Sequence, residues 1–148
     1  VERIAGRAER HRMPRDALEI ELSENVLLHD APAVLAKLEQ LRQRGVRITI
    51  DDFGTRYSSL GHLRRFPING IKIDQSFVRD ITHGERVSPV IHAIVAIARG
   101  FGLELVAEGV ETVVQREALA ALGCNEMQGF LFAEPSGPEA LVRLLAPA

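Results

Sequence analysis

Polar side chains recur along this sequence near the ends of short apolar runs. The set comprises three carboxylates, one ammonium group and one amide, namely Glu21, Asp51, Glu108, Lys72 and Gln128. Carboxylates that converge without cysteines or paired histidines suit hard cations such as Mg²⁺ or Mn²⁺. Asp52 adds a carboxylate directly after Asp51, and adjacent carboxylates can bridge two ions about 3.5–4 Å apart, an arrangement used on phosphate esters.

Lys72 is unusual for this composition. Of the 18 basic residues only Lys37 and Lys72 are lysines, and all the others are arginines. A compact ammonium group can hold a water molecule or an anionic oxygen where the larger guanidinium fork would not fit. The residues themselves therefore predict metal-assisted hydrolysis of a phosphate ester.

Other chemistries lack the residues that they require. The sequence has no glycine-rich loop ending in Gly-Lys-Ser or Gly-Lys-Thr, no G-x-G-x-x-G fingerprint and no G-x-S-x-G elbow. Its five histidines show no metal-ligand spacing. The single cysteine, Cys124, excludes an intrachain disulfide and a cysteine-cluster metal site, and we expect it to be a small buried residue.

The elements that must position these residues alternate between strands and helices. The periodicity predicts strands at residues 18–22, 47–51, 70–73, 103–107 and 126–132. It predicts helices within residues 1–13 and over residues 32–44, from Ser88 to about 100, 112–122 and 138–145. Alternating strands and helices are typical of a parallel α/β sheet, in which chemistry takes place at the carboxyl ends of the strands.

The alternation within each strand distinguishes two parallel architectures. The five polar residues share one face of the sheet, opposite the apolar residues. A doubly wound sheet would bury those charges under helices, whereas a barrel exposes them in its lumen and at its mouth. The fold class predicted is therefore α/β with a (β/α) barrel. Lower in that lumen Glu19, Arg47 and Glu104 are expected to neutralise one another.

Composition limits the class of protein further. The chain has 148 residues, of which 46% are hydrophobic and 26% charged, as expected for one globular domain. A net charge of −2 provides no basic field for DNA or RNA, so we expect neither as a partner. The longest apolar stretch, residues 90–98, is too short to cross a membrane, and no signal peptide is visible. We therefore expect a soluble cytoplasmic domain, and the initial Val1 suggests a fragment of a longer protein.

Six motifs together resemble the EAL domain, a family of bacterial phosphodiesterases that hydrolyse the second messenger cyclic di-GMP to a linear dinucleotide. They occur in order over residues 18–135: Glu21-Leu22-Ser23-Glu24, Asp51-Asp52-Phe53-Gly54-Thr55, Tyr57-Ser58-Ser59-Leu60, Ile71-Lys72-Ile73-Asp74, Ala107-Glu108-Gly109-Val110-Glu111-Thr112 and Gly123-Cys124 through Gln128-Gly129. The resemblance implies a TIM-barrel-like fold. It also implies hydrolysis to linear pGpG with Mg²⁺ or Mn²⁺ as cofactor, two ions being expected.

The resemblance also implies a role for each matching residue. It makes Glu21, Asp51, Asp52 and Glu108 the metal ligands. Glu108, Lys72 and Asp52 become the catalytic residues, with Glu108 proposed as general base and Lys72 holding the attacking water. Gln128 and Asp74 are expected to bind the substrate, and Glu24 to anchor the loop that follows Asp52.

Two departures from the family pattern affect these expectations. The early part of the domain, with the Glu-Ala-Leu strand and a metal-binding Asn, is missing, so residues 1–148 are interpreted as the C-terminal portion of one EAL domain. About five of the eight barrel strands would then be present, and we expect the chain alone to be inactive. Arg56 stands where the family usually has glycine, which disfavours a positive φ in that loop.

Two functions remain open on this basis. The first is a cyclic di-GMP phosphodiesterase, active as the complete domain. The second is a catalytically silent module that binds cyclic di-GMP and relays it to a partner. In either case the resemblance implies a homodimer formed through the EAL domain and upstream sensory or cyclase domains, and it leaves open whether the parent protein is anchored to a membrane.

Overall fold

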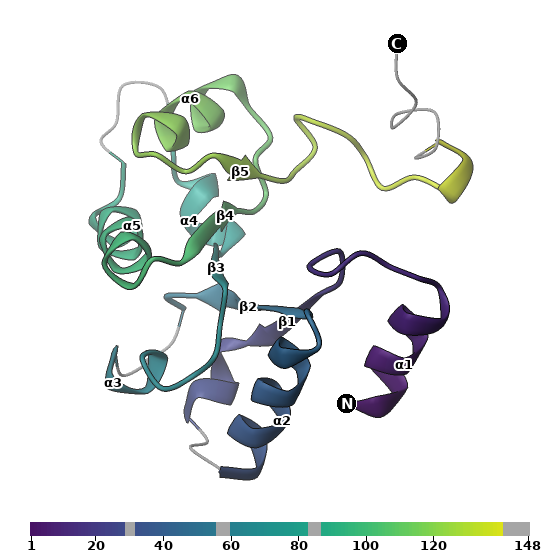
Figure 1. The fold of residues 1–148 in the computed structure, drawn as a ribbon. Helices are drawn as coiled ribbons and strands as arrows, with labels where there is room; N and C mark the ends of the chain where they lie inside the picture. The colour runs from purple at the N-terminus through teal and green to yellow at the C-terminus, as the bar shows by residue number, and fades with distance from the viewer. Residues whose placement is uncertain (29–31, 56–59, 83–86, 141–148) are drawn as a thin grey trace.

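The computed structural model describes residues 1–28, 32–55, 60–82 and 87–140. Its centre is a five-stranded sheet in which every neighbouring pair is parallel (Figure 1). The strands follow one another across the sheet in chain order: β1 (Glu19–Ser23), β2 (Arg47–Phe53), β3 (Gly70–Ile73), β4 (Glu104–Ala107) and β5 (Glu126–Met127). A doubly wound sheet would reverse its strand order part-way, so this sequential order agrees with the barrel winding that the alternation predicts.

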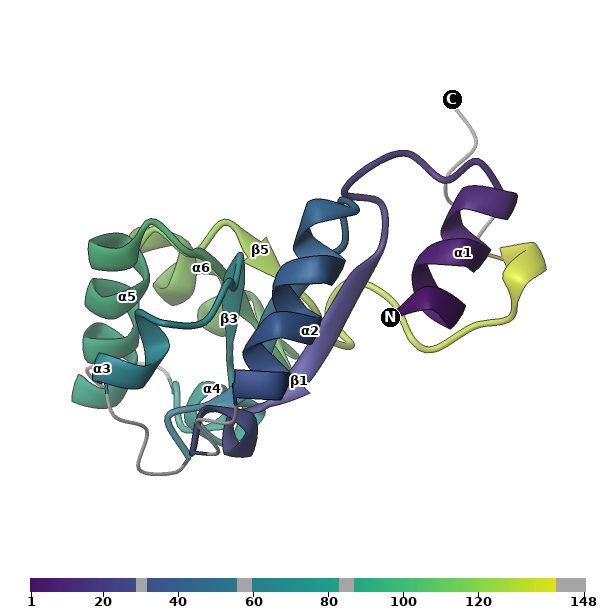
Figure 2. The same ribbon diagram turned by 60° about the horizontal axis from the view of Figure 1, so that its bottom comes forward.

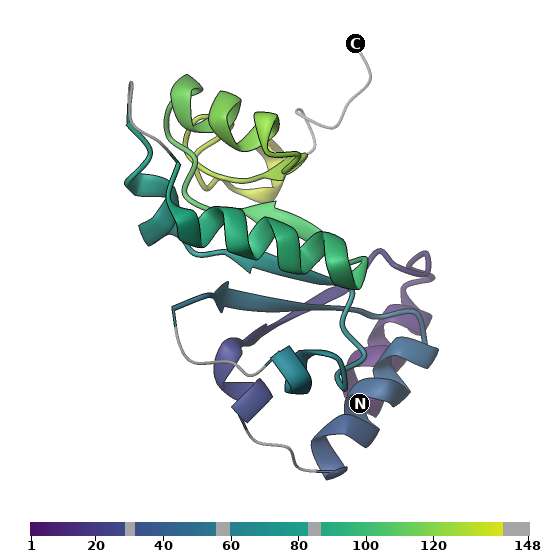
Figure 3. The same ribbon diagram turned by 90° about the vertical axis from the view of Figure 1, so that its left-hand side faces the viewer.

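Helices lie along one side of this sheet. In Figure 1, α2, α5 and α6 follow the strands in turn, below, to the left and above, and Figure 3 shows α5 lying across β3 and β4. The longer helices are α1 (Glu2–Arg10), α2 (Pro32–Gln43), α5 (Pro89–Phe101) and α6 (Val113–Ala121), all close to their predicted positions. Three short elements were not predicted, because four or five residues are too few to display helical periodicity: η1 (Glu24–Leu28), α3 (Leu60–Leu63) and α4 (Gln75–Arg79).

The apolar core lies between the strands and these helices. Ile48, Ile50, Ile71 and Ile73 have no exposed surface, and they are the residues that alternate with the polar set on β2 and β3. Side chains from α2 and α5 pack over them, among them Leu38, Leu41, Ile91, Ile94 and Val95. Each such burial contributes about 1.5–3 kcal/mol relative to exposure, so the alternation fixes which face of the sheet remains polar.

Capping residues place the ends of α5 and α6. The Ser88 side chain accepts a hydrogen bond from the Val90 N–H, Pro89 occupies the first turn, and Gly102 ends the helix in a left-handed conformation. Thr112 and Gln115 form a capping box at the start of α6. The boundaries predicted for both helices are confirmed.

An ion-pair triad lies at the amino end of the polar face. Arg47 Nε donates to Glu19 Oε2 at 3.0 Å, and its Nη2 pairs with the Glu104 carboxylate. Arg47 and Glu104 lie on strands separated by β3, where Gly70 pairs with Glu104 on one side and with Thr49 on the other. A Cβ atom on Gly70 would lie 3.5 Å from the Glu104 Cβ, so the glycine leaves the space beside Glu104 free of a β3 side chain. The predicted mutual neutralisation of these three residues is confirmed.

The C-terminal elements differ from prediction. β5 ends at Met127 instead of continuing to residue 132, because the chain turns at Gly129, where a Cβ atom would clash with the Val110 carbonyl oxygen. The helix predicted from Pro138 to Leu145 is helical over residues 138–140, and its remainder lies outside the described residues. Arg56 also lies outside them, so the prediction about its loop stays a prediction. Among the described residues, no helix has the length and apolar character needed to span a bilayer.

Candidate functional site

The polar residues at the carboxyl ends of the strands converge on Lys72. Its Nζ donates to Glu21 Oε1 at 2.7 Å, pairs with Glu108 Oε1 and lies 3.9 Å from Asp51 Oδ1. The lysine side chain is only 3% exposed, so its charge is compensated almost entirely by these carboxylates. The structure thus brings together four of the five residues that the alternation places on one face.

Gln128, the fifth residue, joins the cluster through Glu108. Its Nε2 donates to Glu108 Oε1 at 3.0 Å. Its own backbone is fixed on both sides, since its N–H donates to the Ala107 carbonyl and its carbonyl accepts from the Val110 N–H. The close approach of Gly129 to Val110 holds this turn in place, so the amide is aimed at the carboxylate by backbone contacts.

A β-bulge orients the adjacent carboxylates of β2. Ile50 pairs with Ile71 and Phe53 with Ile73, so Asp51 and Asp52 together oppose the single residue Lys72. Asp52 adopts a left-handed backbone with φ of 54°. In a regular strand consecutive side chains point to opposite faces, whereas the bulge changes this alternation and lets both carboxylates serve one site. Sequence reasoning missed this bulge, because no pattern in residues 47–53 marks the extra residue.

Asp51, Asp52 and Glu108 form a cluster that fits a divalent cation. One carboxylate oxygen from each lies within 4.8 Å of the other two. Oxygen donors of this kind suit Mg²⁺ or Mn²⁺. Glu21, the fourth predicted ligand, is paired with Lys72 instead of belonging to this trio. The chemistry of the donor set therefore fits the expected ion at three of the four predicted ligands.

Burial and charge act in opposite directions on the two central groups. For Lys72 burial is the largest influence and lowers the pKa, but the hydrogen bonds that it donates to Glu108 and Glu21, with their negative charges, outweigh burial and raise the pKa above the ordinary lysine value. For Glu108 burial dominates and raises the pKa, although the hydrogen bond with Lys72 opposes the rise. The lysine therefore stays charged, while the carboxylate is a stronger proton acceptor than an exposed glutamate.

Asp74 connects the cluster to α4. Its Oδ1 accepts a hydrogen bond from the Ser76 N–H at 2.9 Å and another from the Ser76 hydroxyl, so it is the N-cap of that helix. Burial and a hydrogen bond with Asp74 raise the pKa of Asp52. Burial also acts to raise the pKa of Asp74, but the hydrogen bonds from Ser76 lower it overall. The expected substrate role of Asp74 stays a prediction, and its capping role was missed.

Glu24 is placed where a loop anchor would be. Its side chain is 2% exposed, and its Oε2 accepts a hydrogen bond from the Gly54 N–H at 3.2 Å. Gly54 comes two residues after Asp52, and the loop continues into residues 56–59, outside the described part of the chain. The contact itself agrees with the expected position of Glu24.

Two cavities adjoin the cluster. One of about 420 Å³ borders Glu108 and Gln128, and its lining includes residues outside the six motifs, namely Gln75, Phe130, Ala133, Glu134 and Pro135. Another of about 450 Å³ lies over the inner face beside Glu19, Glu21 and Lys72. Sequence reasoning missed the first set because the turn that brings residues 130–135 back to Glu108 leaves no periodic signal.

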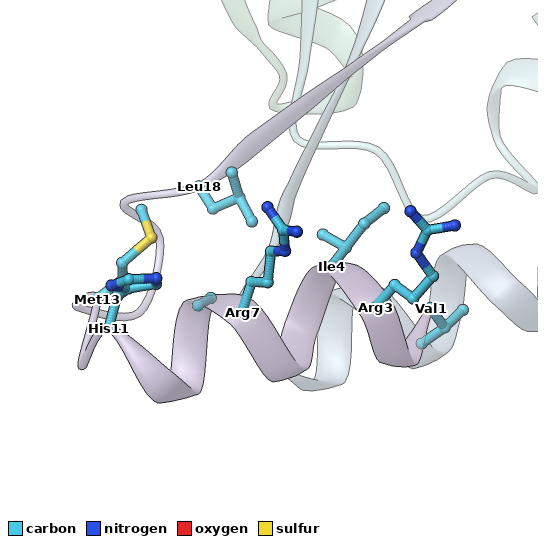
Figure 4. Close-up of a pocket in the computed structure, with 8 residues that line it drawn as sticks. Val1, Arg3, Ile4, Arg7, His11, Met13 and Leu18 are labelled. Atoms are coloured by element: carbon cyan, nitrogen blue, oxygen red, sulfur yellow. The ribbon is translucent and has the colours of Figure 1, made fainter.

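A larger cavity of about 570 Å³ lies away from the cluster, between α1 and the start of β1. Figures 1 and 2 show α1 standing apart from the sheet, and Figure 4 shows Ile4 and Arg7 extending from it toward the segment that carries Leu18. The residues that line it include two arginines and a histidine but no carboxylate. It therefore offers no oxygen ligand set for a divalent cation.

Comparison with known families identifies the family of this chain. The model of the EAL domain matches residues 1–135. The chain belongs to the EAL domain family. This membership confirms the family predicted from the six motifs, together with the TIM-barrel-like α/β fold class of that family.

Curated EAL relatives are similar over most of the chain. The bifunctional diguanylate cyclase/cyclic di-GMP phosphodiesterase MucR of Pseudomonas aeruginosa is 45% identical over 137 residues, which cover 93% of this chain and 20% of MucR. The cyclic di-GMP phosphodiesterase PdeR of Escherichia coli is 47% identical over 119 residues, 80% of this chain and 18% of PdeR. The chain thus spans about a fifth of the length of these relatives.

Solved EAL structures share the fold. The PaMucR phosphodiesterase in its c-di-GMP complex is 44% identical, with a TM-score of 0.85 over 93% of this chain and 56% of that chain. A manganese/cyclic di-GMP complex of BlrP1 from Klebsiella pneumoniae is 32% identical, with a TM-score of 0.78 over 89% of this chain and 34% of that chain.

Proposed function

We propose that residues 1–148 are the C-terminal portion of one EAL domain that, when complete, hydrolyses cyclic di-GMP to linear pGpG in a metal-dependent reaction. The observation that carries the proposal is the cluster of Asp51, Asp52 and Glu108, whose oxygens lie within 4.8 Å of one another beside the Lys72 ammonium. Relatives named as cyclic di-GMP phosphodiesterases support this choice of phosphate ester.

Two divalent ions, Mg²⁺ or Mn²⁺, are part of the proposal. Asp51, Asp52 and Glu108 would hold them, with Glu21 as a further ligand. Bound ions supply positive charge that stabilises the negative charge developing on the phosphate and make water more acidic. The hard oxygen donors of the cluster and the manganese complex of a 32% identical EAL neighbour support this assignment.

The chain's own residues have separate tasks in the reaction. The Lys72 Nζ, held among three carboxylates, orients the oxygen of the attacking water. Glu108 accepts a proton from that water, and burial raises its pKa, which makes it a stronger base than an exposed glutamate. The water oxygen bonds to phosphorus while the bond from phosphorus to the ribose 3′ oxygen breaks, and that oxygen takes up a proton from solvent to become a hydroxyl. The product is therefore linear and carries a 5′ phosphate.

Two further residues are assigned to substrate binding. Gln128 lies 3.0 Å from Glu108, so it can orient that carboxylate and still present an amide oxygen to the substrate. Asp74 accepts both hydrogen bonds from Ser76 on Oδ1, so we assign substrate contact to its other oxygen. Glu24 holds the loop after Asp52 through the Gly54 N–H.

We also propose the oligomeric state, the location and the further domains of the parent protein. We assign it a homodimeric state, a cytoplasmic location and upstream sensory or cyclase domains in the parent protein. The last assignment is supported by MucR, a bifunctional cyclase and phosphodiesterase of which this chain spans 20%.

A second candidate is a catalytically silent module that binds cyclic di-GMP. One observation favours it. The Lys72 ammonium already pairs with Glu21 and Glu108, so two of the predicted metal ligands are compensated within the chain itself. A module of this kind would bind the ligand without cleaving it.

Turnover separates the two candidates. Protein of full natural length is incubated with cyclic di-GMP and Mn²⁺, and pGpG is measured by chromatography. Glu108→Gln is expected to abolish pGpG formation at an unchanged melting temperature, while Glu117→Gln on exposed α6 serves as a matched control with normal turnover. Binding of cyclic di-GMP without cleavage by the wild-type protein supports the silent module. Normal turnover in Glu108→Gln would remove the role of Glu108.

A further inference from the structure

Gly54 is enclosed by three elements that come from different parts of the chain. Its N–H donates to Glu24 of η1 at 3.2 Å. A Cβ atom built on Gly54 would lie 2.9 Å from Cδ1 of Ile94 on α5 and 3.3 Å from Cε2 of Phe77 on α4. The backbone at this point therefore lies directly against two apolar side chains, and it has no room to shift toward either helix.

Both side chains that contact Gly54 are held by the helices that carry them. Ile94 is 2% exposed and projects from the middle of α5, a helix capped at both ends and packed on β3 and β4. Phe77 is half-buried on α4, which begins at the cap formed by Asp74. A shift of Gly54 toward these side chains would require one of the two helices to move away from the sheet.

Gly54 is connected through a short stretch of backbone to Asp52, which lies in the bulge. Asp52, two residues earlier, has a φ of 54°, and Gly54 has a φ of 94°. The Asp52 carbonyl accepts hydrogen bonds from the Thr55 hydroxyl at 2.9 Å and from the Thr55 N–H at 3.4 Å. With Asp52 and Thr55 tied together around Gly54, the position of Gly54 determines the direction in which the Asp52 carboxylate points.

We propose that Ile94 and Phe77 are positioning residues of the candidate metal centre, acting through Gly54 on the backbone of Asp52. Neither side chain bears a ligand atom. Their contact with Gly54 keeps the left-handed turn in the form that brings Asp52 toward Asp51 and Glu108. The identity of the ion rests on the function proposed above, whereas the packing contact does not.

Removal of one methyl group tests this inference. Ile94→Val deletes Cδ1, the side-chain atom nearest to Gly54, and Ile91→Val deletes the same atom from a fully buried isoleucine on the same helix that is not among the nearest neighbours of Gly54. Both variants are made in protein of full natural length, and Mn²⁺ affinity is measured by electron paramagnetic resonance. Thermal melting measures the stability of each.

The expected result is a difference in Mn²⁺ affinity that stability does not explain. Ile94→Val is expected to weaken Mn²⁺ binding about tenfold, within the range for residues that support metal ligands. Ile91→Val is expected to lower the melting temperature by a similar amount and to leave Mn²⁺ affinity unchanged. Phe77→Leu, at the second contact, is expected to weaken Mn²⁺ binding in the same direction as Ile94→Val.

Three outcomes would overturn the inference: wild-type affinity in Ile94→Val, equal weakening in both isoleucine variants, or no Mn²⁺ binding by the wild-type protein. Turnover of cyclic di-GMP is measured on the same samples. Wild-type protein that binds Mn²⁺ and leaves cyclic di-GMP intact would contradict the proposed function, while the affinity difference between Ile94→Val and Ile91→Val would still decide the positioning role.

Discussion

Each end of the sheet's polar face holds one basic residue among carboxylates, but the two ends differ in burial and in the number of carboxylates. At the amino end Arg47 pairs with two carboxylates, and its side chain keeps 24% of its surface exposed. At the carboxyl end Lys72 is 3% exposed and is approached by three carboxylates, with Asp52 close to two of those. The carboxyl end therefore has a larger excess of negative charge, which a divalent cation would relieve.

The backbone is also less regular at the carboxyl end than at the amino end. The triad at the amino end forms across strands in regular register, with Gly70 opposite Glu104. The cluster at the carboxyl end requires a bulge and a non-glycine residue with positive φ. Strain of that kind costs about 1–3 kcal/mol per residue and persists where the surrounding structure fixes it. An ion pair that only stabilises a fold does not require such strain.

Substitution of Lys72 is the strongest test of this difference. Lys72→Ala leaves Glu21 and Glu108 without their buried counter-charge, so we expect a loss of about 3 kcal/mol in the free energy of unfolding and a loss of turnover. Urea unfolding with and without Mn²⁺ measures the effect, and added Mn²⁺ is expected to restore part of the stability. An equal loss with and without the ion would contradict the view that this end needs additional cations.

Substitution of Arg47 is the matched experiment at the other end. Arg47→Ala breaks two ion pairs that retain access to solvent, so we expect a smaller loss, about 1 kcal/mol, with turnover retained. The melting temperature and the rate of pGpG formation are measured together. An unchanged melting temperature would mean that the triad contributes nothing to the fold.

The thiol of Cys124 gives the smallest effect and tests whether the buried position just before β5 is closed to solvent. Cys124 lies just before β5 with no exposed surface, and burial raises its pKa to about 11 from an ordinary 9.0. The folded pKa exceeds the unfolded one, so this contribution to stability is complete below pH 9 and is lost as the pH rises to 11. At pH 8 the thiolate fraction is roughly a hundredfold lower than for a free thiol.

Labelling with a thiol reagent at pH 8, before and after addition of urea, measures the reactivity of Cys124. Slow labelling of the folded protein and rapid labelling of the unfolded protein are expected. Fast labelling of the folded protein would contradict the burial of this thiol beside the amino-end triad.

Much of this arrangement could be predicted from sequence, for identifiable reasons. Strict alternation places Ile48 and Ile50 against the helices, and therefore Arg47 and Asp51 on the other face. Ser88 and Gly102 mark the ends of α5, because the chemistry of a cap is local. The convergence of Glu21, Lys72, Glu108 and Gln128 follows from the same alternation, combined with the parallel sense of the strands.

Features that depend on contacts distant in sequence could not be predicted. The bulge at Asp52 arises from the pairing of β2 with β3, and neither strand reveals the shift alone. Gly129 ends β5 early because it lies against the Val110 backbone, a contact formed only after folding. The contact between Ile94 and Gly54 joins residues forty positions apart, and hydrophobic periodicity marks them only as apolar and neutral.

The sequential order of the strands has a consequence for self-association. It leaves β1 and β5 as the edges of the sheet, and exposed edges can pair with other copies of a chain. β1 carries Glu19 and Glu21 on one face, while β5 is only two residues long. Two β1 edges would set like charges side by side, and two β5 edges would form few hydrogen bonds. The edges thus resist unspecific aggregation yet would accept a strand with compensating positive charge.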